Sequence, residues 1–119
     1  MNSGVGVFRA EEGIAAALVK VRDLKERWKR VPIRSKGGVF NMELLSVIEL
    51  GFMLDLAEVI ALGALQREES RGAHSRRDFP ERDDQSWLKH TLAYHTADGP
   101  KLDYSPVTIT RWEPERRVY

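Results

Sequence analysis

The residues best suited to chemistry lie in one charged tract, residues 67–84, which reads REESRGAHSRRDFPERDD. Eleven of its eighteen residues are charged, and Arg71 and His74 stand near its centre. An arginine can form two parallel hydrogen bonds to a carboxylate, and a histidine titrates near neutral pH. The tract is therefore an active-site loop, a nucleic-acid contact, a solvated surface, or a set of ion pairs that holds the fold together.

Metal binding and nucleophilic catalysis are disfavoured by the residue types present. The chain has no cysteine, which excludes disulfides, thiolate ligands and cysteine nucleophiles. His90 and His95 are five residues apart in a strand-like segment, so they point to opposite faces and do not easily share a metal. No serine stands in a nucleophile elbow.

Phosphate and nucleic-acid binding receive little support. The triplet GVG at residues 4–6 begins like a dinucleotide-binding loop, but Arg9 stands where a third glycine is needed. Residues 25–36 gather six bases around Trp28, a pattern that can bind nucleic acid. However, the chain has 19 basic and 18 acidic residues, a net charge of +1, without the basic excess of nucleic-acid domains. We predict a bend at 4–6, a solvated helix end at 25–36, and no nucleic-acid partner.

Two long helices are expected to position the tract. In residues 11–31, acids precede bases as the helix dipole prefers, and Pro32 ends the segment. A second helix is expected from Asn41, a good N-cap, to about Ser70, with Gly72 ending it in the left-handed conformation. The first helix has apolar residues at spacings of three and four, which form a bundle-type seam: Ile14, Ala17, Val21, Leu24, Trp28 and Val31.

The second helix is apolar around nearly its whole circumference, so it must be covered on several sides. Five large aliphatic side chains left in water would forfeit about 7–15 kcal/mol, at about 1.5–3 kcal/mol each. Glu49 lies inside this apolar surface, and we expect it to be buried and paired, because an unpaired buried carboxylate is costly. Since Asp55 and Glu58 also interrupt the segment, it is interpreted as a soluble helix rather than a membrane span.

The C-terminal third of the sequence has a strand-like rather than a helical pattern. Residues 87–112 contain β-rich runs on either side of Asp98-Gly99, which predicts a hairpin. Pro106 restricts the segment after it to an edge or an irregular strand. Residues 113–119 are expected to form a surface tail.

The tract also carries a resemblance to a known family. The pattern RxESRGAHxRxDFPxRDDxxWLKHTL, with NSGVGVFR near the start and ELLSVIELGFMLDLAE in the second helix, resembles the C-terminal region of the flavoprotein subunit of succinate dehydrogenase and fumarate reductase. The likeness covers essentially the whole chain. L-aspartate oxidase shares the RxESRG part, but the hairpin and the RVY ending are more similar to the respiratory enzymes.

The resemblance implies a mainly α fold, part of a spectrin-like three-helix bundle. Residues 1–72 would hold two long helices of the bundle, and residues 73–119 the charged connector, the β-hairpin and the tail. The first bundle helix would lie mostly upstream of Met1. In the family, FAD is attached through a histidine in a Rossmann-like domain, and a capping domain completes the dicarboxylate site. None of those motifs is present here, so the resemblance assigns no catalytic, cofactor-binding or metal-binding residue to this chain.

Two functions from different classes are carried forward. The resemblance implies a structural domain of an oxidoreductase that interconverts succinate and fumarate and passes electrons to iron–sulfur clusters and quinone. Its partners would be the flavin and capping domains and the iron–sulfur subunit, in a complex on the cytoplasmic side of a membrane, and the fragment alone would be inactive. The alternative is a free-standing helical adaptor that self-associates through exposed helix faces and binds nucleic acid weakly.

Within the first function, the tract is expected to be an interdomain clasp. Arg71 and Glu49 should be desolvated and paired, whereas Arg76 and Arg77 should be more exposed. The residues expected at contacts between domains or partners are Glu49, Arg71, His74, Arg76, Asp78, Arg82, Asp83 and Asp84.

Overall fold

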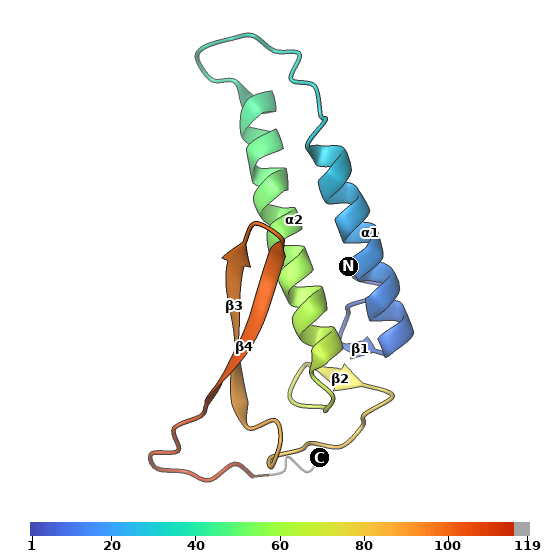
Figure 1. Ribbon diagram of the computed structural model, residues 1–119, viewed down its shortest axis with the longest axis vertical. Coiled ribbons are helices and arrows are strands. Elements are labelled where there is room, and N and C mark those ends of the chain that lie inside the picture. Colours follow the sequence, from blue (N-terminus) through green and yellow to red (C-terminus); the bar gives the residue numbers. More distant parts are fainter. Residues whose placement is uncertain (116–119) are drawn as a thin grey trace.

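Two antiparallel helices form the long axis of the molecule, and a β-hairpin lies beside the second helix (Figure 1). The structure is a computed structural model that describes residues 1–115. The predicted mainly helical fold, with two long helices followed by a hairpin, is confirmed. In chain order the elements are β1 (Phe8–Arg9), α1 (Glu11–Trp28), α2 (Met42–Gln66), β2 (Ser75–Arg76), β3 (Lys89–Thr96) and β4 (Gly99–Pro106).

Helix α1 buries one face against α2 and ends earlier than predicted. Ile14 and Val21 of the predicted seam are buried, together with Leu18. The helix ends at Trp28, three residues before Val31, and the next residues form tighter turns. The physical reason is Pro32, whose ring disfavours the α conformation of the residue before it.

Helix α2 begins as predicted and ends before the predicted residue. The Asn41 side chain accepts a hydrogen bond from the Leu44 N–H at 3.1 Å, which confirms the N-cap. The helix ends at Gln66 rather than Ser70, and Arg67 is extended. Gly72 has a positive φ of 58°, but it lies in a turn closed by hydrogen bonds between Arg71 and His74, not at the helix end.

Trp28 of α1 packs closely against Gly51 of α2. A Cβ atom on Gly51 would lie 2.5 Å from Cζ2 of Trp28, so only glycine leaves room for the indole. The indole N–H donates to the Val47 carbonyl at 2.7 Å. Trp28 is therefore half-buried and packs between the two helices, as predicted, and it is not an exposed surface for base stacking.

The hairpin forms where predicted, but its loop lies one residue earlier than Asp98-Gly99. Thr96 pairs with Gly99 across the antiparallel ladder, which leaves Ala97 and Asp98 as a two-residue loop. Gly99 has a positive φ of 114°, a conformation that glycine adopts without strain. Strand β4 ends at Pro106, and the missing N–H of this proline favours a strand end.

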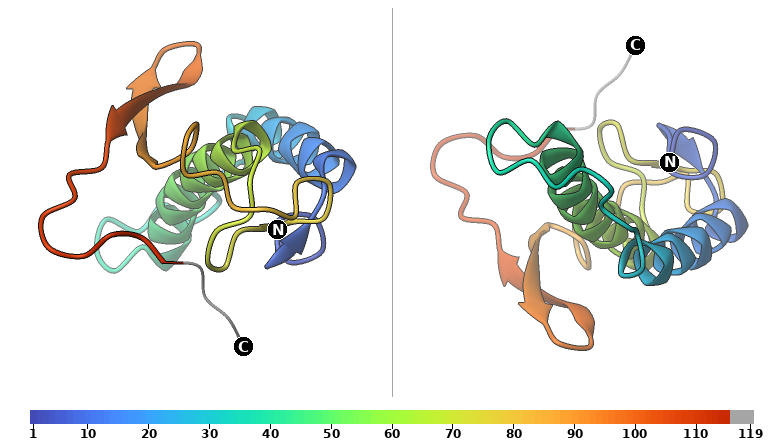
Figure 2. Two further views of the ribbon diagram at one scale, coloured as in Figure 1. Left: turned by 90° about the horizontal axis from the view of Figure 1, so that it is seen from below. Right: turned by 90° about the horizontal axis from the view of Figure 1, so that it is seen from above.

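A short parallel pairing, not predicted from the sequence, joins the N-terminal segment to the charged tract. Strand β1 pairs with β2, with Phe8 opposite Ser75 and Arg9 opposite Arg76. The view from below shows the N-terminal segment and the tract side by side at the lower end of the helices (Figure 2). The predicted bend at residues 4–6 precedes β1, where two N–H groups bond to the Met1 carbonyl.

Candidate functional site

The charged tract folds into a network of ion pairs at the end of the helix pair, which we call the clasp. Its members are Arg67, Glu69, Arg71, His74, Arg76, Asp78, Arg82 and Asp84. Strands β1 and β2 hold one side of it, and the C-terminus of α2 holds the other.

Glu69 is the centre of the clasp and is fully buried, with 0% of its surface exposed. One carboxylate oxygen accepts from Arg67 at 2.5 Å and from Arg71 at 2.9 Å. The other accepts from Arg71 at 3.0 Å and from the Asp83 N–H at 3.1 Å. Burial by itself would raise the pKa of Glu69, but these donors outweigh it and hold the pKa below its usual value.

Arg76 and Asp78 connect the ends of the two helices. The Arg76 guanidinium makes two parallel bonds of 2.7 Å to the Asp78 carboxylate. Its Nη1 donates to the carbonyls of Ala64 and Leu65, at 3.0 and 2.9 Å, which α2 leaves without helical partners. Asp78 in turn accepts from the Glu11 N–H at 3.0 Å and so caps α1, whose own N-cap residue is an alanine.

Each charge of this pair lies at the helix end that stabilises it. A cation is favoured at the C-terminus of α2 and an anion at the N-terminus of α1. The hydrogen bonds from Arg76 lower the pKa of Asp78 strongly, so the carboxylate is ionised at neutral pH. The prediction that Arg76 is among the more exposed arginines is wrong, because the side chain lies under the tract with 1% exposure, whereas Arg77 is exposed as predicted.

His74 lies between one hydrogen-bond donor and one acceptor, and these two groups fix its tautomer. A backbone carbonyl only accepts, so the Nε2 atom that lies 3.1 Å from the Arg67 carbonyl carries the proton. Nδ1 then accepts from Arg9 at 3.3 Å. Burial, followed by the nearby charges of Arg9, Arg76 and Arg67, lowers the pKa of His74, so it is a neutral part of the clasp at pH 7.

The outer part of the clasp joins the tract to the tail. Asp84 accepts from Arg71 at 2.6 Å and from Arg82 at 2.6 Å. Arg82 also donates to the Pro114 carbonyl at 3.3 Å. Asp83 accepts from the N–H groups of Gln85 and Ser86, both at 2.9 Å, and thus stabilises a local turn. Arg71 is paired as predicted, with Glu69 and Asp84 as its partners, but 29% of its side chain is exposed, so the predicted desolvation is partial.

Glu49 is exposed within this chain, and no ion pair to it is formed among residues 1–115. The expectation that it is buried and paired is therefore wrong for the chain by itself, because the side of α2 that carries it is not covered by α1 or the hairpin. Its contact with another domain stays a prediction. The buried carboxylates are instead Glu58 and Glu69, which sequence reasoning did not select.

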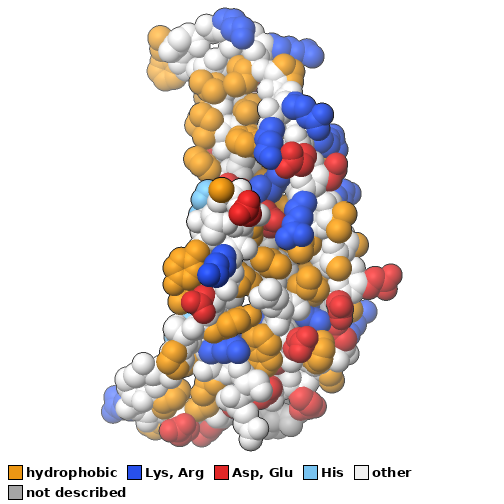
Figure 3. All heavy atoms as spheres, viewed as in Figure 1, with side chains coloured by type: hydrophobic (Ala, Val, Ile, Leu, Met, Phe, Trp, Pro, Cys, Tyr) orange, Lys and Arg blue, Asp and Glu red, His pale blue; other side chains and the backbone are white. Residues whose placement is uncertain are grey.

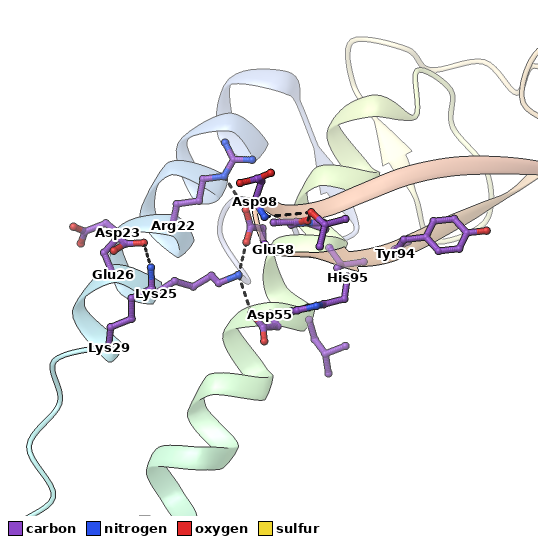
Figure 4. A pocket seen from close by; sticks show the side chains of 17 residues that line it. Arg22, Asp23, Lys25, Glu26, Lys29, Asp55, Glu58, Tyr94, His95 and Asp98 are labelled. Carbon is purple, nitrogen blue, oxygen red and sulfur yellow. Dashed lines mark hydrogen bonds and ion pairs between the residues drawn. The ribbon is translucent and has the colours of Figure 1, made fainter.

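Glu58 forms a second ion-pair cluster, in a cleft of about 690 Å³ between α1, α2 and the hairpin tip. Figure 4 shows the Lys25 ammonium between two carboxylates, 2.7 Å from Glu58 and 2.7 Å from Asp55. Arg22 donates to Glu58 at 2.8 Å. Lys29, which also lines the cleft, pairs with Glu26.

The chemistry available in the described part of the chain is structural. The clasp joins its charges to one another, and it contains no nucleophile with an adjacent base. No group of three or more His, Asp or Glu side chains within residues 1–115 is arranged to hold a metal ion. In the same residues, no helix is long and apolar enough to cross a membrane.

Comparison with known proteins identifies the family. The family described as fumarate reductase flavoprotein C-term matches residues 1–119. The fumarate reductase flavoprotein subunit of Haemophilus influenzae is 47% identical over 120 residues, which are 100% of this chain and 20% of that protein. The succinate dehydrogenase flavoprotein subunit of Rickettsia conorii is 37% identical over 127 residues, with 100% and 21% covered.

A solved structure of a substituted E. coli quinol fumarate reductase has the same fold. It superimposes with a TM-score of 0.94 at 48% identity, and the match covers 100% of this chain and 21% of that one. The chain thus spans about one fifth of the relatives that it matches. It belongs to the family of C-terminal domains of fumarate reductase and succinate dehydrogenase flavoprotein subunits.

Proposed function

We propose that this chain is a structural domain that packs on the flavin-bearing and capping parts of its subunit and faces the iron–sulfur subunit. The observation that carries this proposal is the uncovered apolar side of α2, where six large side chains are exposed: Met42, Leu45, Phe52, Met53, Leu56 and Ile60. A partner surface that buries them stabilises the assembly, because each buried side chain of this size contributes about 1.5–3 kcal/mol.

The redox chemistry of the parent enzyme belongs, in this proposal, to the other four fifths of the subunit. Its relatives are named as flavoproteins, which implies FAD. The glycines at residues 4–6 do not support a phosphate-binding loop for that cofactor. Gly4, the glycine nearest to a phosphate-loop pattern, is packed against α1, where a Cβ atom would lie 2.7 Å from the Gly13 carbonyl. Its role is close backbone packing, so we assign the flavin contacts to residues outside this chain.

The proposed parent reaction is the interconversion of succinate and fumarate, with two electrons passing between FAD, iron–sulfur clusters and a quinone. The name of the related E. coli enzyme, quinol fumarate reductase, supports a quinone partner for that enzyme. By the same likeness we propose a membrane-associated complex in which this domain lies on the cytoplasmic side. The domain contributes stability and contact surface to this reaction, not a catalytic group.

A thermal melt tests the proposal. The flavin-bearing remainder of the subunit is heated with increasing amounts of this chain, and unfolding is followed by flavin fluorescence. Because a partner that binds only the folded state shifts the equilibrium by mass action, the melting temperature should rise with the concentration of the chain. An unchanged melting temperature, with the chain forming its own oligomer, contradicts the proposal and favours a self-associating adaptor.

A further inference from the structure

The N-terminal segment is attached to the charged tract through a short strand pairing. Strand β1 pairs with β2 over two residues. The Ser75 N–H donates to the Val7 carbonyl at 3.1 Å, and the Arg77 N–H donates to the Arg9 carbonyl at 2.8 Å. Strands of this length are below the usual range of about 3–10 residues. The attachment of β1 therefore depends on the side chains that lie beside the pairing.

The side-chain contact beside the pairing joins Arg9 to His74. Nη1 of Arg9 lies 3.3 Å from Nδ1 of His74, and Nη2 donates to the Ala73 carbonyl at 3.4 Å, so both bonds are long. The Nε atom of Arg9 is buried and has no hydrogen-bond partner within residues 1–115. None of the ion pairs formed among these residues includes Arg9. The guanidinium is thus weakly held, and the neutral imidazole is one of its two acceptors.

Protonation of His74 would turn this contact from attraction into repulsion. The charged groups that face the imidazole are cations on each neighbouring element: Arg9 on β1, Arg67 at the end of α2 and Arg76 on β2. A protonated imidazole carries an N–H on both nitrogens and accepts no hydrogen bond. Nε2 would keep its bond to the Arg67 carbonyl, but the new N–H at Nδ1 would point at the N–H of Arg9. Two donors and two positive charges would then meet at one point.

The ion pairs of the clasp persist in the mild acid that protonates a histidine. Figure 3 shows acidic and basic side chains side by side over the lower end of the molecule, where the tract lies. Burial acts against it, but the arginines around Glu69 hold its pKa below the usual value. Arg76 lowers the pKa of Asp78 strongly. Both carboxylates therefore stay ionised at about pH 5.5, a pH below the ordinary histidine value of about 6.5.

We propose that the pairing of β1 with β2 is an acid-sensitive latch, in which protonation of His74 repels the Arg9 guanidinium and strand β1 then separates from the tract. At neutral pH the imidazole accepts from Arg9 and the latch is closed. When it opens, the ion pairs of Glu69 and Asp78 remain, so the helix pair stays folded and α1 keeps its cap. The latch is independent of the proposed function, because it is built from contacts within residues 1–115.

Hydrogen–deuterium exchange of the full-length subunit, read at single residues, tests the latch. The Ser75 and Arg77 N–H groups report its opening, because their acceptors lie on the N-terminal segment. After correction for the intrinsic pH dependence of exchange, their opening constants should rise by up to about tenfold between about pH 6.5 and 5.5, since each pH unit changes the protonated-to-neutral ratio of a free imidazole tenfold. The Ser70 N–H, which donates to the Glu81 carbonyl in the same tract, should not change.

A His74→Gln variant shows whether the imidazole is the group that titrates. Glutamine offers a donor and an acceptor but takes up no proton in this range, so the exchange of both reporting amides should lose its pH dependence. The matched control is His90→Gln, at an exposed position of β3, which should keep the rise seen in the unsubstituted subunit. Arg9→Met supplies a second variant, in which no guanidinium is left to repel and the rise should shrink.

Three results would overturn the latch. The first is no rise at Ser75 and Arg77 in the unsubstituted subunit, a result that does not depend on the folding of any variant. The second is the same rise in His74→Gln or in Arg9→Met, because another group would then control the opening. The third is an equal rise at Ser70, because the whole tract would then open and β1 would not separate by itself.

Discussion

Replacing Arg76 by methionine tests how the clasp stabilises the fold. The substitution keeps an apolar stem of similar length but removes the guanidinium. Asp78 then loses both of its 2.7 Å bonds, and the carbonyls of Ala64 and Leu65 lose their donor. Asp78 remains as the cap of α1, but without the cation that orients it. One substitution thus perturbs the ends of both helices.

The expected cost depends on the burial of the pair. Removing one partner of a buried ion pair costs about 3–5 kcal/mol. Arg76 is buried, but 28% of the Asp78 side chain is exposed, so water replaces part of what Asp78 loses. We therefore expect the lower end, about 3 kcal/mol. For a urea dependence of about 2 kcal/mol per molar, the unfolding midpoint should fall by about 1.5 M.

The assay is urea unfolding of the 119-residue chain, followed by circular dichroism, with Arg77→Met as the matched control. Arg77 is exposed, and its guanidinium lies 6.0 Å from the Phe8 ring centroid, so its replacement should cost less than about 0.5 kcal/mol. Amide exchange adds a local measurement, since the Glu11 N–H should exchange faster in Arg76→Met. Equal midpoints for the two variants would refute the account of the clasp.

Three further predictions concern other parts of the molecule. Gly51→Ala should destabilise the chain by about 1–3 kcal/mol through overpacking against Trp28, and the shift in tryptophan emission would report the displaced ring. The pKa of His74 is lowered in the folded state, so the stability that the neutral imidazole contributes is fully present above about pH 6.5 and is lost as the pH falls through the folded pKa. His74→Gln should therefore flatten the dependence of the urea midpoint on pH between about pH 7.5 and 5.5. In the assembled subunit, Arg71→Ala should lower the melting temperature far more than Arg77→Ala, because Arg71 bridges Glu69 and Asp84 whereas a surface arginine contributes about 0–1 kcal/mol; equal small shifts would contradict this.

Much of the helical structure could be predicted from local signals. Asn41 is a good N-cap and occupies the N-cap position, and Asp98-Gly99 predicts the hairpin turn, because both depend on residues adjacent in sequence. The end of α2 could not be predicted in this way. Its last carbonyls bond to Arg76, and the position of Arg76 depends on the pairing of β2 with β1, a strand distant in the sequence.

Which charged side chains are buried could also not be predicted from local sequence patterns. Glu49 and Glu58 stand on the same apolar helix, and their sequence surroundings are similar. Glu58 faces α1, where Lys25 and Arg22 reach it, whereas Glu49 faces away from α1. Arg76 and Arg77 are neighbours, and strand geometry places one side chain under the tract and the other in solvent. Only the tertiary arrangement decides which member of each pair is buried.

The most direct measurement of the central claim is the accessibility of the uncovered apolar side of α2 in the assembled subunit. Because this chain contains no cysteine, a Leu56→Cys variant introduces its only thiol, and mass spectrometry can follow alkylation of that peptide. The thiol should react readily in the 119-residue chain, where Leu56 is 63% exposed, and slowly in the full-length subunit. A cysteine at the exposed position Arg27 serves as the comparison for general reactivity. Equal alkylation rates at position 56 in the chain and in the subunit would contradict the claim that this domain docks through α2.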